Sequence, residues 1–289
     1  MDQNQQKQTA FPPQHQERQP GLETQMNPTP KSEDDNYRGS GKLKGKTALI
    51  TGGDSGIGKA VAIAFAKEGA NVAIAYLDEH EDAQTTKQQV EKHGAACLLL
   101  AGDLAQEEQC RHVVEETVKQ FGGLNIVVNN IAQQYPQQRL EDITAEQWNR
   151  TFQINVFSYF AVTKAALPHL QQGDSIINTA SITAYEGNEL LLDYSSTKGA
   201  IVSFTRSLAK SLVQKGIRVN GVAPGPIWTP LIPASFDSQK VAEFGTNTPM
   251  GRAGQPYELA PAYVYLASGD SSYVTGQMIH INGGKPVGG

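Results

Sequence analysis

Tyr194 and Lys198 stand four residues apart, and Ser181 lies thirteen positions before Tyr194. On a helix, a four-residue spacing places the phenol and the ammonium on one face. An unperturbed Tyr hydroxyl has a pKa of about 10, too high for efficient proton exchange at neutral pH, and a neighbouring ammonium lowers that pKa. A hydroxyl from Ser181 could hydrogen-bond the oxygen whose proton moves. These residue types suit general acid–base catalysis.

The same spacing also occurs in helices without catalytic function, where the ring packs and the amine reaches solvent. The catalytic interpretation therefore depends on the elements that position the three residues. The apolar pair at 176–177, with Thr179, predicts a short buried strand that ends at Ser181. Helical spacing from about Tyr194 to Val213 predicts the helix that carries the Tyr/Lys pair.

The start of the folded body predicts a binding site for a dinucleotide. Residues 46–51 have the composition of a strand, Gly-Gly-Asp-Ser-Gly-Ile-Gly follows at 52–58, and helical spacing runs from Lys59 to Lys67. A strand, a glycine turn and a helix in this order are typical of dinucleotide-binding turns. The glycines let the backbone approach a pyrophosphate, whose charge is favoured by the helix N-terminus.

The alternation of strand and helix then continues along the chain. We expect strands at 72–76, 96–101, 124–128, 217–222 and 277–281, and helices at 78–92, 106–121, 145–170 and 256–267. Residues 225–253 are rich in Pro, Gly and Thr and predict a mobile loop with short helices. The pattern predicts an α/β fold with a doubly wound parallel sheet in three layers, helices on both faces, in a single domain.

Composition excludes several classes of function. A net charge of −5 offers no basic surface for nucleic acid. Cys97 and Cys110 lack CxxC spacing, which favours reduced thiols, and His80, His93 and His112 lack ligand spacing, so we expect no metal site. Neither a transmembrane run nor a hydrophobic signal core is present, and we expect a cytoplasmic protein without membrane contact.

Residues 1–42 differ in composition from the body at 43–289. They are rich in Gln and Pro and hold few large apolar residues, so they cannot fold alone. Two interpretations stay open: a solvated tail, slightly favoured, or an extended arm laid on a subunit surface. In the second, the anchors would be Phe11, Leu22, Met26 and Tyr37.

From about 43 to 284 the chain resembles the short-chain dehydrogenase/reductase family of the common single-domain type, which has a Rossmann-type fold. The motifs that carry the resemblance are, in order, Thr51–Gly58, Asn129–Asn130, Asn155, the set Ser181, Tyr194 and Lys198, and Pro224–Gly225 with Thr229. The extension resembles bacterial general-stress members and plant proteins likened to glucose and ribitol dehydrogenases. The sequence departs from the family at Ile131–Ala132, usually Ala-Gly, and at Tyr76, where many relatives carry an Asp for the ribose hydroxyls.

The resemblance implies an oxidoreductase that uses NAD or NADP. Hydride would pass between the nicotinamide and the carbonyl or alcohol carbon of a small aldehyde, ketone, sugar or polyol. Tyr194 would be the general acid or base, Lys198 would lower its pKa and bind the nicotinamide ribose, Ser181 would orient the substrate, and Asn155 would hold a relay water. The other implied cofactor contacts are Gly52, Asp54, Ser55, Gly56, Ile57, Gly58, Tyr76, Leu77, Asp103, Leu104, Asn130, Ile131, Pro224, Gly225, Ile227 and Thr229.

Alternatives stay open for single residues and for the function. Asp103 could cap the following helix instead of contacting adenine. Asn155 could be a buried amide that bridges two backbones, and Trp228 could be a substrate wall or loop packing. The alternative functions are a 3-oxoacyl-thioester reductase, a non-catalytic dinucleotide sensor and a stress-protective structural protein.

Charge at the end of the second strand bears on the choice of cofactor. A 2′-phosphate requires cations, yet the glycine turn offers Asp54 and Ser55 before Lys59, and carboxylates at 78–79 follow Tyr76. We therefore expect both cofactors to bind, with a slight preference for NAD.

Surplus apolar residues predict an assembly. The helices expected at 145–170 and 194–213 are apolar on more than one face, through Phe152, Phe157, Tyr159, Phe160, Ile201, Phe204 and Leu208. One face is needed to cover the sheet, so the others predict a subunit interface. Since relatives commonly pair these helices across a two-fold axis, we expect a homotetramer, with a dimer as the alternative.

Overall fold

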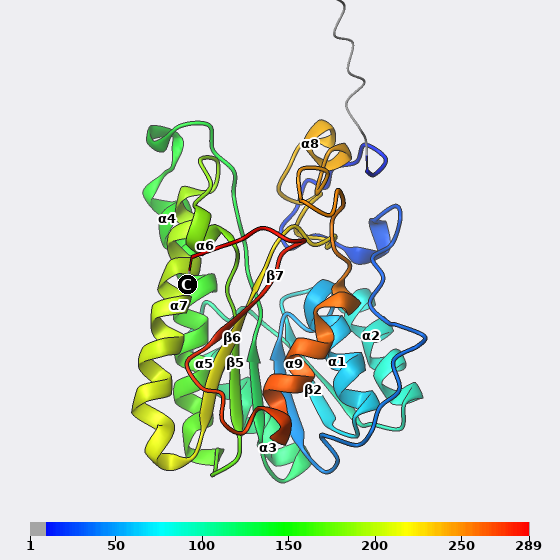
Figure 1. Cartoon of the computed structure of the whole chain (residues 1–289), viewed down its shortest axis with the longest axis vertical. Helices are drawn as coiled ribbons and strands as arrows, with labels where there is room; N and C mark the ends of the chain where they lie inside the picture. The colour runs from blue at the N-terminus through cyan, green and yellow to red at the C-terminus, as the bar shows by residue number, and fades with distance from the viewer. Residues whose placement is uncertain (1–9, 289) are drawn as a thin grey trace, which may run out of the picture.

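The computed structural model describes residues 10–288, which contain a parallel sheet of seven strands. The strand order is β3-β2-β1-β4-β5-β6-β7 (Figure 1). The strands are β1 Thr47–Thr51, β2 Asn71–Tyr76, β3 Cys97–Ala101, β4 Ile126–Asn129, β5 Ser175–Thr179, β6 Arg218–Pro224 and β7 Met278–Ile281. The expected α/β fold with a doubly wound parallel sheet is confirmed.

Helices cover both faces of the sheet. They are α1 Gly56–Lys67, α2 His80–Lys92, α3 Glu107–Phe121, α4 Ala145–Phe152, α5 Ser158–Ala166, α6 Thr183–Glu186, α7 Leu192–Leu212, α8 Ser238–Ala242 and α9 Ala260–Ala267. Side chains of α1, α2 and α9 share one buried cluster with the strands, and those of α3, α5 and α7 share another. The molecule is therefore a three-layer sandwich with the sheet in the middle (Figure 1).

The strand order reverses between β1 and β4. Ile50 of β1 pairs with Val128 of β4, and Asn129 pairs with Asn178 of β5, so the carboxyl ends of these strands meet at one edge. In open α/β sheets, the crevice outside the carboxyl ends at such a reversal is where ligands bind. The glycine turn after β1 lies at this edge.

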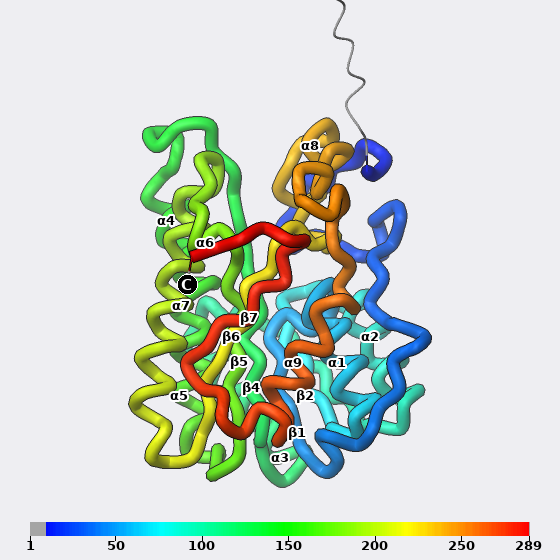
Figure 2. The backbone as a smooth tube through the Cα atoms, in the orientation of Figure 1, coloured from blue at the N-terminus to red at the C-terminus, as the bar shows by residue number. Residues whose placement is uncertain are grey.

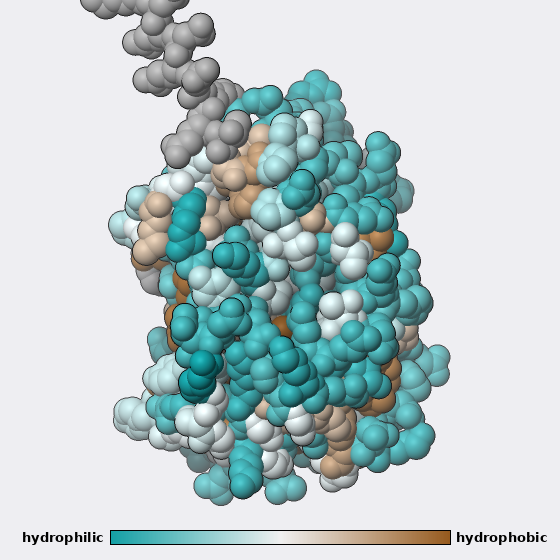
Figure 3. All heavy atoms as spheres, turned by 90° about the vertical axis from the view of Figure 1, so that its right-hand side faces the viewer, coloured by the Kyte–Doolittle hydropathy of each residue, from teal (hydrophilic) through white to brown (hydrophobic). Residues whose placement is uncertain are grey.

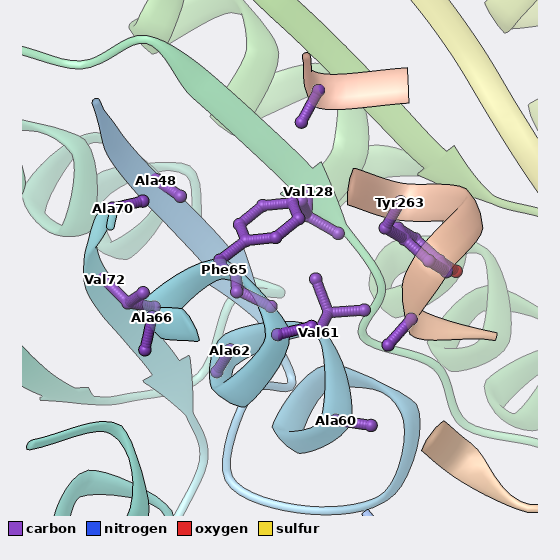
Figure 4. Close-up of a cluster of buried hydrophobic side chains, with 14 of the residues drawn as sticks. Ala48, Ala60, Val61, Ala62, Phe65, Ala66, Ala70, Val72, Val128 and Tyr263 are labelled. Atoms are coloured by element: carbon purple, nitrogen blue, oxygen red, sulfur yellow. The ribbon is translucent and has the colours of Figure 1, made fainter. Parts of the chain in front are cut away.

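Close packing holds α1 against the sheet. Val61 and Phe65 of α1 meet Ala48 of β1, Val128 of β4 and Tyr263 of α9, and all five are fully buried (Figure 4). Small residues elsewhere on α1, such as alanines, let the helix approach the strands closely. The turn that begins α1 is consequently held in place relative to β1 and β4.

The expected long helix at 145–170 is interrupted. A π-helical segment, Gln153–Phe157, separates α4 from α5, and a 3₁₀ turn ends the run at His169. Apolar periodicity does not reveal one wider turn inside a helix, so the sequence could not predict it. Two residues expected at a subunit interface, Tyr159 and Ile201, are instead buried within the chain.

Residues 10–42 lie along the surface of their own chain, and we call them the arm (Figures 1 and 2). The Phe11 ring stacks on Trp228 with centroids 3.8 Å apart, Met26 packs in the same cluster, and the Tyr37 hydroxyl donates to Glu68. Hydrophilic residues dominate the side of the molecule shown in Figure 3. The start of the extension, 1–9, falls outside the described residues.

Three further expectations concern thiols, metals and membranes. Cys97 and Cys110 are free and buried, and burial raises the pKa of each thiol to about 12. Within residues 10–288 no group of His, Cys, Asp and Glu could hold a metal ion. In the same part of the chain, every helix is too short or too polar to cross a membrane.

Candidate active site

Helix α7 carries Tyr194 and Lys198 one turn apart on the side that faces the sheet edge. Tyr194 is 8% exposed and Lys198 is 1% exposed. The Lys198 ammonium donates to the Thr179 carbonyl at the end of β5, 2.9 Å away, and lies 5.3 Å from the centroid of the Tyr194 ring. The end of β5 thus fixes the amine beside the phenol.

Ser181 follows β5 and faces the same group. Its hydroxyl oxygen accepts hydrogen bonds from the Thr183 backbone N–H and from the Thr183 hydroxyl, each 3.1 Å long. With two donors on its oxygen, the Ser181 hydroxyl has its own proton to donate, and the Tyr194 oxygen lies within its reach. Ser181, Tyr194 and Lys198 therefore form one group.

Burial controls the proton affinities of the pair. It raises the pKa of Tyr194 to about 12, and the hydrogen bond from Ser181 opposes this only partly. Burial also lowers the pKa of Lys198 to about 7. The lowering of the Tyr194 pKa by a charged Lys198 ammonium stays a prediction.

Two adjoining cavities lie at the carboxyl edge of the sheet. The larger, of about 470 Å³, holds the Ser181, Tyr194 and Lys198 group. The smaller follows the glycine turn to the ends of β2 and β3. Both are lined by Ile57, Asn130, Ala132, Thr229 and Leu231. The two cavities therefore form one continuous cleft.

The glycine turn is shaped for close approach. Gly52 and Gly56 have φ of +64° and +52°, which other residues rarely adopt. A Cβ on Gly58 would lie 1.9 Å from the Gly52 carbonyl oxygen, so only glycine lets α1 begin here. The first N–H groups of α1 lack intrahelical partners, and that of Gly56 donates to the Glu23 carboxylate, so this end of the helix favours an anion.

The family is shown by comparison with known proteins. Residues 52–285 match the family model described as "Enoyl-(Acyl carrier protein) reductase", which belongs to the short-chain dehydrogenases. The chain is 59% identical over 277 residues to General stress protein 39 of Bacillus subtilis, covering 96% of this chain and 97% of that protein. The chain belongs to the short-chain dehydrogenase/reductase family.

Two further relatives bear on this short-chain dehydrogenase/reductase. Glucose and ribitol dehydrogenase of Daucus carota is 52% identical over 285 residues, which cover 96% of this chain and 98% of that one. The crystal structure of a short chain dehydrogenase from Burkholderia cenocepacia in complex with NADP has a TM-score of 0.79 and 30% identity, covering 84% of this chain and 98% of that chain. The expected resemblance to general-stress and glucose and ribitol dehydrogenase proteins is confirmed.

The cleft of this short-chain dehydrogenase/reductase brings together most of the residues expected from the sequence. Those that line it are Gly52, Asp54, Ser55, Gly56, Ile57, Tyr76, Leu77, Asp103, Leu104, Asn130, Ile131, Ser181, Tyr194, Lys198, Pro224, Gly225, Ile227 and Thr229. Gly58 and Asn155 do not line it. Gly58 does not line the cleft because it packs directly against the Gly52 carbonyl inside the turn.

Asn155 lies in the π-helical segment and is fully buried. Its amide accepts from the Gln133 N–H and donates to the Gln133 carbonyl, both at 2.9 Å, and it also donates to the Thr197 hydroxyl at 3.1 Å. These contacts match the alternative interpretation, a buried amide that bridges backbone segments. The relay role stays a prediction.

Asp103 is already engaged on both carboxylate oxygens. The Ala105 N–H donates to it at 3.0 Å, and Arg150 donates at 2.9 Å. Partial burial raises the pKa of Asp103, but these hydrogen bonds outweigh it and hold that pKa below its usual value. The alternative in which Asp103 caps the following helix is wrong, because Gln106 is the N-cap of α3 and Asp103 instead accepts from the N–H two residues on, in the turn before it. The adenine contact stays a prediction.

Sequence reasoning missed several residues of the cleft. Arg150, Glu79, Pro20 and Gly21 all line the smaller cavity. Arg150 comes from α4 and reaches the end of β3, a contact that spacing along the chain does not reveal. For Trp228 the sequence allows a substrate wall or loop packing. In the structure Trp228 is fully buried against the arm, and its indole N–H donates to the Pro28 carbonyl at 2.8 Å. Its role here is therefore packing of the loop against the arm.

Proposed function

We propose that the protein is an oxidoreductase that uses NAD or NADP and converts a small aldehyde, ketone, sugar or polyol. The observation that carries the proposal is the placement of Ser181, Tyr194 and Lys198 in a cavity continuous with the glycine-turn cleft. Membership of an oxidoreductase family and the NADP complex of the Burkholderia cenocepacia relative support it.

The residues present fit a dinucleotide. The glycine turn has no room for a side chain at Gly58, and the φ of +64° at Gly52 disfavours one there, which leaves backbone for a pyrophosphate to approach. The Gly56 N–H donates to the Glu23 carboxylate of this chain at 2.8 Å, which supports a preference for negative charge at the start of α1. When bound, the nicotinamide supplies the hydride chemistry.

The proton steps belong to the chain's own residues. With a pKa of about 12, Tyr194 carries its proton at neutral pH and can donate it to a carbonyl oxygen during reduction. Ser181 would hold that oxygen by donating its free proton. Lys198, with a pKa of about 7, changes charge near neutrality and would favour the phenolate when charged. Asn155 and Thr197 would keep α7 in register with the loop after β4.

Polar groups that line the larger cavity bear on the substrate. Glu186, Asn188, Lys240, Asn247 and Lys285 line it together with apolar loop residues. Glu186 and Lys285 already pair with each other at 3.3 Å. Hydroxyl-rich molecules can hydrogen-bond the amides of Asn188 and Asn247, whereas a long acyl chain offers these amides no such contact. We therefore favour sugars, polyols and small carbonyl compounds over 3-oxoacyl thioesters.

A turnover assay tests the proposal. Aldehydes, ketones, sugars, polyols and an acyl thioester are offered with each cofactor, and absorbance of the reduced nicotinamide is followed. We expect turnover on a sugar, polyol or small carbonyl compound. Activity confined to the thioester would favour the reductase alternative, and cofactor binding without turnover on any compound would favour a sensor.

A further inference from the structure

The arm reaches the glycine turn with a buried carboxylate. Glu23, in the short 3₁₀ turn Glu23–Gln25 of the arm, is 2% exposed. Its Oε2 accepts from the Gly56 N–H at 2.8 Å, and its Oε1 pairs with the Lys59 ammonium. Both partners belong to the first turn of α1, so one side chain of the arm holds the start of this helix.

A second buried carboxylate holds Glu23 in place. Asp82 of α2 is 1% exposed and accepts from the backbone N–H groups of Glu23 and Thr24, at 2.6 and 3.0 Å. The resulting network runs from α2 through the arm to the glycine turn. Its side chains are withdrawn from water, where hydrogen bonds to charged groups are at their strongest.

Glu23 acts from outside the cleft. Neither Glu23 nor Lys59 lines either cavity, whereas Gly56 and Ile57 line the smaller one. Among residues 10–288 the Ile57 N–H makes no hydrogen bond, so this donor is left for a ligand. Because the Glu23 carboxylate and the Lys59 ammonium neutralise each other, the pair adds no net charge beside the turn. Glu23 therefore supports the turn without taking the place of an anion.

A different contact attaches the arm at the other end of α1. Glu33 pairs with Lys67, the last residue of α1, at 2.8 Å, and with His93 at 3.0 Å. None of these three residues lines the cleft. The arm thus has one ion pair at the glycine turn and another far from it, which allows attachment of the arm and support of the turn to be separated.

We propose that Glu23 is a positioning residue for the dinucleotide turn: its carboxylate holds the Gly56 N–H and the start of α1 in the conformation that receives a pyrophosphate. The inference rests on the proposed function. Gly56 has φ of +52° and, as a glycine, adopts many other conformations once this contact is lost. A turn that is competent only part of the time binds with a Kd raised in proportion.

The extension thereby becomes a working part of the site, although it precedes residues 52–285, which match the family model. Two consequences follow from the geometry. NADH and NADPH share the same pyrophosphate, so loss of the Glu23 contact should weaken both equally. Coupling between two sites is reciprocal, so a bound cofactor should stabilise the docked arm by the same factor.

Binding titrations without substrate test the role of Glu23. NADH and NADPH are titrated into the full-length protein, and nicotinamide fluorescence is followed. Removal of Glu23 alone would leave a buried ammonium without its partner, so both charges are removed together. For Glu23→Ala combined with Lys59→Met we expect the Kd of each cofactor to rise about tenfold, because one charge-assisted hydrogen bond is lost.

Two further variants separate support of the turn from attachment of the arm. Glu23→Gln combined with Lys59→Met keeps a carbonyl that accepts from the Gly56 N–H. The Kd of each cofactor should then rise only about threefold, since a neutral hydrogen bond is roughly half as strong as a charge-assisted one. The matched control is Glu33→Gln, which loosens the arm at the far end of α1 and should change neither Kd.

Several outcomes would overturn the inference. They are no rise in either Kd, a rise for one cofactor only, an equal rise in the two double variants, or an equal rise in Glu33→Gln. In these cases the unmodified protein still binds cofactor and the proposed function stands. Failure of the unmodified protein to bind either cofactor would overturn the proposed function as well.

Hydrogen exchange on the unmodified protein tests the coupling even if the double variants do not fold. Amide exchange is followed by mass spectrometry with and without NADH. Exchange in residues 22–26 should slow when NADH is present, because the cofactor stabilises the docked arm. Unchanged exchange there, with slower exchange in the glycine turn at 52–58, would show that the cofactor binds independently of Glu23 and would overturn the inference.

Discussion

The hydroxyl of Tyr194 is the residue-scale feature on which the proposed chemistry depends. Tyr194→Phe keeps the buried ring and removes the proton donor, so turnover should fall by about 100- to 10,000-fold while NADH still binds. Steady-state kinetics on a confirmed substrate and a binding titration measure the two effects. The matched control is Tyr273→Phe, whose side chain is fully exposed. Near-full activity of Tyr194→Phe would exclude the proposed role.

Lys198 allows a residue-scale prediction about stability and pH. Its pKa is lowered to about 7 by burial, so between pH 7 and its unfolded value near 10.5 the unfolded state binds more protons. Stability from this group therefore rises with pH across that window. Lys198→Met removes this pH-dependent cost. The free energy of unfolding of the variant minus that of the unmodified protein should therefore be larger at pH 6 than at pH 9, by roughly 1–3 kcal/mol.

Urea unfolding of both proteins at the two pH values measures this difference. The other titrating groups are shared by the two proteins, so they cancel in the comparison. A relative stability of Lys198→Met that does not change between pH 6 and pH 9 would contradict the lowered pKa of Lys198.

The arm is the element whose packing was least evident from the sequence. Phe11 stacks on Trp228 with an interplanar angle of 8°, and Trp228 belongs to the loop beside the cleft. Phe11→Ala should lower the free energy of unfolding by about 1–2 kcal/mol, since Phe11 is half-buried and loses both contact area and stacking. Phe11→Leu, which keeps apolar contact, should lose less.

Urea unfolding and hydrogen exchange in residues 228–236 measure this prediction. Exchange in that loop should quicken in Phe11→Ala because the stacked ring no longer holds Trp228. Equal stability of Phe11→Ala and the unmodified protein would show that the arm is not docked in solution.

At the scale of the whole molecule, apolar side chains on the outer surfaces of α4, α5 and α7 favour assembly. Trp148, Phe160 and Leu192 are 37%, 44% and 37% exposed. We expect a homotetramer by light scattering, and Phe160→Glu should give smaller species because it places a charge in the interface. The control Gln84→Glu adds the same charge to an exposed site on α2. A monomer at micromolar concentration would contradict the prediction.

The fold, and the placement of Ser181, Tyr194 and Lys198 in one group, were largely predictable because local patterns encode them. Apolar runs and helical spacing identify the strands and helices, and the four-residue spacing of Tyr194 and Lys198 places them on one face of α7. The interruption at Gln153–Phe157 was not predictable, because one wider turn shifts the apolar pattern by a single residue, which the irregular spacing of apolar residues conceals. The degree of burial that raises the pKa of Tyr194 to about 12 was not predictable either, because burial depends on neighbours distant in sequence.

The sequence by itself determined the alternation of strands and helices, the glycine turn and the residue types of the catalytic group, because each depends on residues close together along the chain. Only the tertiary structure decided where the arm lies and what surrounds Glu23. The stacking of Phe11 on Trp228 and the ion pair of Arg18 with Asp78 join segments far apart in sequence. Such contacts form only once the sheet and its loops create the surface that the arm covers.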